Sequence, residues 1–199
     1  MKRSTLVSIA AVSVLVAVGC AKPPQDEISA TQAEMDRARQ AQADTWAANE
    51  LRAADEAMSA AQAEVSAQNE KWVKNYDKAK ELLTKAKEDA AKAAEAAAAN
   101  KVQAKMDAEA AIAAADTAVQ TAGAALKVAP VTKDSKADLE LFKNDLATLT
   151  STLDAARQSF ASEDYKKALE SANSVKDQAT SIAAQLEEAK AKRAGVRKK

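Results

Sequence analysis

The sequence is poor in the residues that carry most catalytic, metal-binding and turn-forming chemistry. Among its 199 residues there are no histidines, one cysteine, three glycines, three prolines and six aromatic residues. Without histidine, the usual general base and the commonest metal ligand are missing. A single cysteine excludes an internal disulfide, and so few glycines and prolines argue against a β-sandwich or a barrel. We therefore predict no enzymatic activity, no metal site and no bound cofactor.

Alanine and charged residues dominate what is present. The chain contains 53 alanines, which make up more than half of the 47% hydrophobic fraction, and 29% of its residues are charged. Alanine is the strongest helix former, but its methyl group gains only about 0.8 kcal/mol on burial, against about 2–3 kcal/mol for leucine. The composition predicts an all-α fold of long alanine-rich helices with no sheet, whose core is weaker than the hydrophobic fraction suggests.

The N-terminal segment has the pattern of a secretory signal. Lys2 and Arg3 precede an uncharged, largely apolar stretch that ends at Gly19-Cys20. The small residue before Cys20 resembles the lipobox of bacterial lipoproteins, although Ala17 stands where that family usually has leucine. The resemblance implies a signal peptide over residues 1–19, lipidation of Cys20, and a short tether over residues 20–26. Two alternatives stay open: an uncleaved signal anchor, and an ordinary cleaved signal in which Cys20 has no role.

The resemblance also implies a location and a first partner. Ala21, rather than aspartate, follows Cys20, which in enteric-type lipoproteins favours the outer membrane, with the chain facing the periplasm. The membrane would then be bound through the lipid on Cys20. Without Lys2 and Arg3 the chain has 27 basic and 29 acidic residues, a net charge of −2, so we predict no nucleic-acid partner.

Seven-residue spacing of apolar residues predicts four helical segments, over residues 27–69, 75–127, 135–160 and 165–194. In the first segment, every seventh residue forms an apolar stripe that changes phase near Trp46. Ser135 and Asp138 have the spacing of a capping box at the start of the third segment. We predict two antiparallel helical hairpins, at 27–128 and 134–194, with a basic tail at 195–199. The apolar stripe of the first segment consists of Leu51, Met58, Val65 and Trp72.

A local sequence repeat supports the two hairpins. Residues 75–79 (Asn-Tyr-Asp-Lys-Ala) recur at 164–168 (Asp-Tyr-Lys-Lys-Ala), an offset of 89. We expect Tyr76 and Tyr165 to begin the second helix of each hairpin and to pack against the first helix. The pattern resembles tetratricopeptide-type repeats and a family of bacterial alanine-rich lipoproteins whose domain has no assigned function. The packing is expected to be coiled-coil-like or tetratricopeptide-like.

The two hairpins differ in side-chain size. Residues 90–125 are dominated by alanine, whereas residues 139–186 contain most of the large apolar seam residues. We therefore predict that stability is concentrated in the second hairpin and that the long helix over residues 75–127 frays most readily.

Three residues are candidate contacts for a partner. Trp46 and Trp72 could line a groove for a ligand or peptidoglycan, although aromatics in such a fold more often pack in the seams. Lys199 ends a basic run, and the murein lipoprotein of enteric bacteria, which this chain resembles in its order of parts, is joined to peptidoglycan through a C-terminal lysine. The leading hypothesis is a non-enzymatic outer-membrane lipoprotein that acts as a periplasmic spacer or scaffold for protein or peptidoglycan contacts. The alternatives are a tetratricopeptide-like binding module, a peptidoglycan-linked tether and an oligomeric coiled coil.

Overall fold

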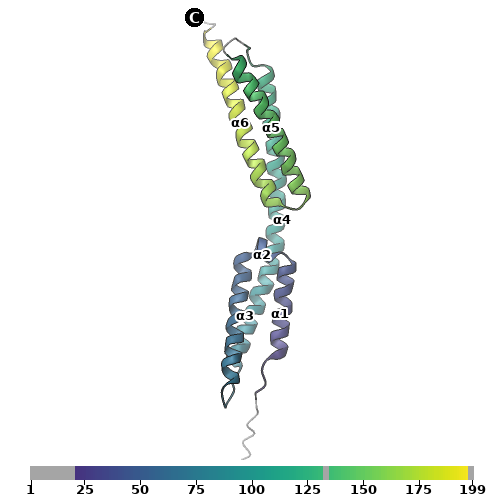
Figure 1. Ribbon diagram of the computed structural model, residues 1–199, viewed down its shortest axis with the longest axis vertical. Helices are drawn as coiled ribbons and strands as arrows, with labels where there is room; N and C mark the ends of the chain where they lie inside the picture. Colours follow the sequence, from purple (N-terminus) through teal and green to yellow (C-terminus); the bar gives the residue numbers. More distant parts are fainter. Residues whose placement is uncertain (1–20, 132–134, 197–199) are drawn as a thin grey trace, which may run out of the picture. The chain divides into compact units, whose positions relative to one another are not determined.

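The computed structural model describes residues 21–131 and 135–196, and these form six helices and no strand (Figure 1). The prediction of an all-α fold without a sheet is confirmed. The α3–α4 and α5–α6 pairs are helical hairpins, as the repeat predicted. The helices are α1 Gln25–Gln40, α2 Ala43–Trp46, α3 Ala48–Asn69, α4 Asp77–Lys127, α5 Lys136–Ala161 and α6 Tyr165–Val196.

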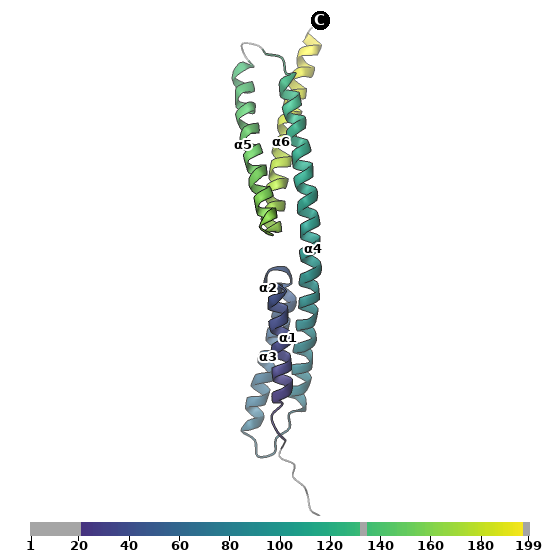
Figure 2. The same cartoon turned by 90° about the vertical axis from the view of Figure 1, so that its right-hand side faces the viewer.

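The chain packs as two compact units that share α4. The first unit contains the described residues up to Arg37 together with Asn49–Ala91, and the second contains Ala38–Ala48 and the chain from Lys92 onward. Helix α4 is continuous over its 51 residues and contributes its first part to one unit and the rest to the other (Figures 1 and 2). The hairpin boundaries predicted from sequence keep α4 whole, whereas packing divides it near Ala91.

The first unit is a three-helix bundle of α1, α3 and the beginning of α4. Met35, Met58 and Leu83, one from each helix, lie in a single buried cluster with alanines of α3 and α4. Ile28 in the first turn of α1 packs with Val65 near the end of α3, so these two helices are antiparallel. Because most of the buried positions are alanine, the helix axes can approach closely.

The predicted single helix over residues 27–69 is wrong, because the chain turns back between α1 and α3. Helix α1 ends at Gln40, Gln42 has a left-handed backbone with φ 61°, and Ala47 has φ −146° before α3 begins. The reversal lets the apolar stripes of α1 and α3 both face α4, which accounts for the change of phase near Trp46. Neither glycine nor proline marks this turn.

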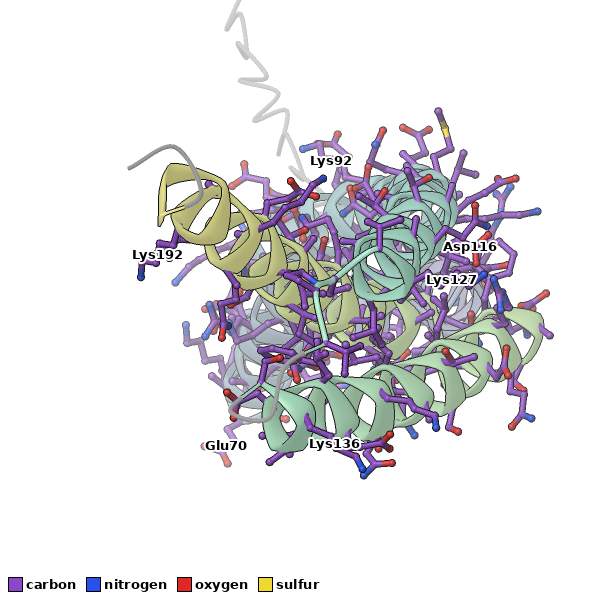
Figure 3. All side chains as sticks on the ribbon, turned by 90° about the horizontal axis from the view of Figure 1, so that it is seen from above. Glu70, Lys92, Asp116, Lys127, Lys136 and Lys192 are labelled. Atoms are coloured by element: carbon purple, nitrogen blue, oxygen red, sulfur yellow. The ribbon has the colours of Figure 1, made fainter. Side chains whose placement is uncertain are left out.

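The second unit is a three-helix bundle of α4 from Lys92, α5 and α6. Its core joins leucines of α5 and large aliphatic residues of α6 to alanines of α4, and Lys136 and Lys192 point away from α5 and α6 (Figure 3). The capping box predicted at Ser135 is absent: the Ser135 hydroxyl donates to the Pro130 carbonyl oxygen at 3.0 Å and makes no cap bond to α5. The α5 and α6 core residues are Leu146, Leu149, Leu153, Val175, Ile182 and Leu186.

Candidate functional site

Trp46 packs within the second unit. Its ring is half-buried, with its centroid 6.4 Å from that of Tyr165, and the Lys166 ammonium lies 4.8 Å above it. Tyr165 in turn packs against Phe160, with 5.2 Å between the centroids. A cation over an indole face gains roughly 0.5–1 kcal/mol at an exposed site. The ring therefore attaches α2 to α6, and a role of Trp46 in partner contact stays a prediction.

The backbone around α2 is held by side chains from two other helices. Asn100 of α4 donates its Nδ2 proton to the Trp46 carbonyl oxygen at 2.7 Å. The Lys166 ammonium of α6 donates to the Thr45 carbonyl oxygen at 2.6 Å. These bonds satisfy carbonyl groups at the end of a four-residue helix that has little stability of its own.

Lys101 connects two helix ends that have unusual backbone conformations. Its Nζ atom lies 3.1 Å from Gln42 Oε1 and 2.7 Å from Glu163 Oε2. Gln42 and Glu163 are the non-glycine residues with positive φ among the described residues, at 61° and 62°. The hydrogen bond from Lys101, together with its positive charge, holds the pKa of the Glu163 carboxyl below its ordinary value. We call Gln42, Lys101 and Glu163 the lysine junction.

The end of α5 explains why Glu163 has this backbone. The Asp164 amide donates to the Ser159 carbonyl at 2.9 Å, and the Glu163 amide donates to the Phe160 carbonyl at 3.0 Å. This pair of bonds is a Schellman motif, in which the left-handed position is usually glycine. In a chain with three glycines, a charged residue occupies it and is held by Lys101. The sequence carried no signal for the lysine junction, because its members are 59 and 62 residues apart.

Trp72 lies in the loop between α3 and α4 and is 97% exposed. The prediction that it continues the stripe of Leu51, Met58 and Val65 is wrong, because α3 ends at Asn69 and only the first three are buried. Trp72 is therefore open to solvent in the first unit, and its role in partner contact, alone or with Trp46, stays a prediction.

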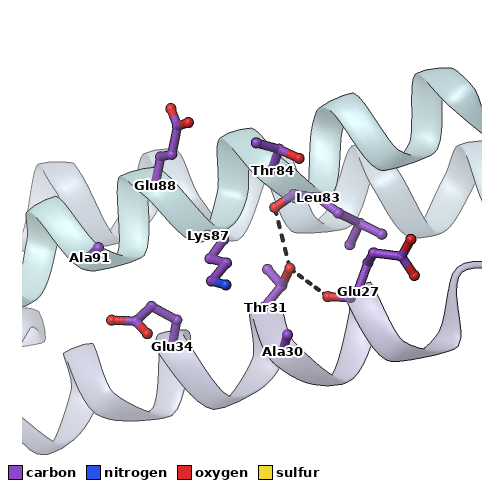
Figure 4. Close-up of a pocket in the computed structure, with 9 residues that line it drawn as sticks. All are labelled: Glu27, Ala30, Thr31, Glu34, Leu83, Thr84, Lys87, Glu88 and Ala91. Atoms are coloured by element: carbon purple, nitrogen blue, oxygen red, sulfur yellow. Dashed lines mark hydrogen bonds between the residues drawn. The ribbon is translucent and has the colours of Figure 1, made fainter.

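A shallow groove of about 500 Å³ runs between α1 and α4 in the first unit (Figure 4). Buried Thr31 is at its centre, with its hydroxyl oxygen 2.8 Å from the Glu27 carbonyl oxygen and 3.2 Å from that of Leu83. Ala30 and Ala91 form other parts of the lining, and charged side chains surround it. The charged residues are Glu27, Glu34, Lys87 and Glu88.

Two of the predicted site residues, Cys20 and Lys199, lie outside the described residues. Over the part of the chain that is described, none of the helices is long and apolar enough to cross a membrane. The same residues contain no group of three or more acidic or cysteine side chains placed to hold a metal ion.

No protein family matches this sequence, and comparisons with curated proteins and with solved structures gave no significant match. The resemblance to envelope lipoproteins and to tetratricopeptide hairpins therefore stays a prediction from sequence.

Proposed function

We propose that this chain is a non-enzymatic lipoprotein of the bacterial cell envelope that serves as a helical spacer or scaffold. Cys20 would carry the lipid and hold the chain on the periplasmic face of the outer membrane. The observation that carries the proposal is α4, one unbroken helix of 51 residues that supplies a core face to both units. At 1.5 Å per residue such a helix is about 75 Å long, which suits a part whose work is to span distance.

The way the interior is filled supports a structural role. The buried positions of α4 between Ala86 and Ala97 are all fully buried alanines. Alanine at these positions closes the seam between helices and leaves little room for a substrate. On the outer faces, charges pair along the helices, as Lys192 does with Glu188 at 2.7 Å, which keeps a long helix soluble.

Mass spectrometry of the N-terminal fragment from native membranes tests the anchor. We expect residues 1–19 to be removed and a diacylglycerol thioether to be present on Cys20. The Cys20→Ala variant should keep residues 1–19, whereas an Ala21→Ser control should be processed and lipidated as usual. An unmodified Cys20 in membrane-bound protein would contradict the proposal.

A second candidate function is a binding module for an envelope peptide or small ligand, and the groove between α1 and α4 favours it. The groove combines an alanine-lined wall with charges of both signs, which suits a short amphipathic segment. A photo-crosslinking residue at Ala91, inside the groove, should capture a defined partner in intact envelopes. The matched control is the same residue at Met106, which is exposed on α4 outside the groove. Equal labelling at both positions would argue for a spacer alone.

The peptidoglycan-linked alternative rests on Lys199. If that lysine is joined to peptidoglycan, digestion of purified sacculi should release a muropeptide attached to the C-terminal peptide. Sacculi without any such peptide would eliminate this alternative and leave the lipid-anchored spacer intact.

A further inference from the structure

The loop between α3 and α4, residues 70–76, exposes a large apolar surface at its apex. Trp72 is 97% exposed and its neighbour Val73 is 70% exposed. Lys71 and Lys74 flank this pair and are exposed as well. Tryptophan is highly buried on average in folded proteins, so full exposure of one of the two tryptophans in the chain needs an explanation.

The base of the loop is fixed by part-buried hydrogen bonds. The Gln68 side chain is buried, accepts a bond from the Asn75 amide at 3.2 Å and donates to Glu64 at 2.7 Å. The Tyr76 hydroxyl donates to Asn69 Oδ1 at 2.6 Å. These bonds join the last turn of α3 to the start of α4, so the apex projects from a closed base.

The loop lies at the end of the first unit where α1 begins. Ile28 packs with Tyr76, and Lys80 pairs with Glu27 at 3.7 Å, so the first turns of α1 and α4 are level (Figures 1 and 2). Pro24, just before α1, is buried against this end. Residues 21–24 separate Cys20 from α1, and four extended residues span at most about 14 Å.

We infer that the 70–76 loop is a second membrane contact, in which Trp72 and Val73 enter the interfacial region of the bilayer that holds Cys20. The inference rests on the proposed function for its lipid anchor. A tether of about 14 Å keeps this end of the unit within reach of the lipid headgroups. Tryptophan favours that zone, because its ring is apolar and its indole N–H finds polar partners there.

The flanking charges determine how the contact depends on lipid. Lys71 and Lys74 can extend their ammonium groups to the phosphates while their methylene chains lie along the apolar layer. Glu70 in the same loop offsets one of these charges. Insertion should therefore be driven by the apolar pair and depend only weakly on the fraction of anionic lipid.

Two single-tryptophan variants of the whole membrane-extracted protein test the inference. Trp46→Phe leaves Trp72 as the reporter, and Trp72→Phe leaves Trp46, which packs inside the second unit. Both are reconstituted into phosphatidylethanolamine–phosphatidylglycerol vesicles with and without bromine-labelled acyl chains. We expect Trp72 emission to move to shorter wavelength and to be quenched by the labelled lipid, with little change as phosphatidylglycerol is reduced. Emission from Trp46 should be unaffected by either treatment.

The lipid on Cys20 is measured separately on the same samples by mass spectrometry. If Cys20 is lipidated and Trp72 stays solvent-like and unquenched, the loop is not a membrane contact. If a native partner protein then shields Trp72 while the labelled lipid still does not quench it, the loop is a protein-binding site instead. If Cys20 carries no lipid, the proposed function fails. The loop is then tested after coupling the free Cys20 thiol to a maleimide lipid, and quenching there still supports the loop contact.

Discussion

Helices α4 and α6 bury the same register of positions but fill them with side chains of different size. Offset by 89 residues, the buried pairs begin with Tyr76 and Tyr165. After Leu83, α4 continues with alanine alone, whereas α6 supplies valine, isoleucine and leucine. The later pairs are Ala86 with Val175, Ala90 with Ala179, Ala93 with Ile182, and Ala97 with Leu186. Because interaxial distance follows side-chain size, we expect the helices to approach more closely along the alanine positions of α4 than along the aliphatic positions of α6.

The two hairpin turns differ as well. The α3–α4 turn is long, and side-chain amides and a tyrosine hydroxyl fix its base. The α5–α6 turn is short and depends on a left-handed Glu163 held by Lys101. The first hairpin therefore combines a weak seam with a turn whose base is held by side-chain hydrogen bonds next to the Glu64–Lys78 ion pair. The second combines a strong seam with a turn whose left-handed residue is itself part of an ion pair.

Truncating the fully buried leucines of each seam should have the largest effect. Leu83→Ala and Leu153→Ala should each cost about 3 kcal/mol, because each leaves a cavity in a closed core. The first unit buries fewer large side chains, so Leu83→Ala should remove a larger share of its stability. Hydrogen exchange measured at increasing urea concentration tests this difference in stability. In the Leu83→Ala variant, amide protection should be lost first in the first unit. Slowest exchange in residues 90–105 would contradict the comparison.

Enlarging one alanine in each seam tests how closely the helices approach. Ala90→Leu should cost about 3 kcal/mol, because its cluster contains several alanines, which have no rotamer to change and so cannot make room. Ala179→Leu should cost about 1 kcal/mol, since leucine and isoleucine neighbours can change rotamer to make room. Chemical denaturation of both variants measures the difference. Equal costs at both positions would mean that the seams are not packed differently.

Removing one hydroxyl from each repeated tyrosine tests the turns. Tyr76→Phe should cost about 1 kcal/mol, because its hydroxyl donates to Asn69 in a part-buried site. Within the described residues no group hydrogen-bonds to the Tyr165 hydroxyl, so Tyr165→Phe should change stability by less than about 0.5 kcal/mol. Thermal unfolding of the two variants gives the comparison, and a larger loss for Tyr165→Phe would overturn it.

The seams could be predicted from the sequence because they follow a local periodicity. Leu51, Met58 and Val65 are buried as their spacing indicated, and both repeated tyrosines pack against the preceding helix. Periodicity does not report where a helix stops when no glycine or proline marks the end. The seven-residue spacing therefore predicts a stripe that continues to Trp72, and it gives no sign of the turn between α1 and α3.

The sites could not be predicted, because they depend on contacts between residues far apart in the chain. The lysine junction brings Gln42, Lys101 and Glu163 together only after α2 packs against α4 and α6. Nothing in the neighbourhood of Lys101 distinguishes it from the other lysines of α4. The stripe changes phase near Trp46 because this residue ends the four-residue helix α2, where the chain reverses between α1 and α3.

Gly123→Ala should raise stability by roughly 0.5–1 kcal/mol, which separates helix propensity from packing in α4. A Cβ atom at this position meets nothing within 4 Å, so the new methyl adds no strain. Alanine also restricts the unfolded chain more than glycine does. The exposed neighbouring change Ala124→Gly should lower stability by a similar amount. If thermal unfolding shows no gain for Gly123→Ala, local propensity does not limit the stability of this part of α4.

The smallest effect should be a dependence of the α5–α6 turn on pH. The hydrogen bond from Lys101 lowers the pKa of the Glu163 carboxyl in the folded chain. Stability from this contact is therefore present above the ordinary glutamate pKa and is lost as the pH falls through the lowered value. Lys101→Met should return the pKa of Glu163 toward its ordinary value, as followed by carbon-detected NMR titration of the carboxyl group. Lys105→Met is the matched control, because Lys105 acts on Glu163 only through its charge and should shift this pKa less. The α3–α4 turn has a lowered carboxyl pKa of its own, at Glu64, through the hydrogen bond from Gln68 and the pairing with Lys78, so its base should also respond as the pH falls. Lys101→Met should therefore remove the pH dependence of hydrogen exchange at the α5–α6 turn and leave that of the α3–α4 turn unchanged. If the response of both turns changes, the Lys101–Glu163 pair does not act locally.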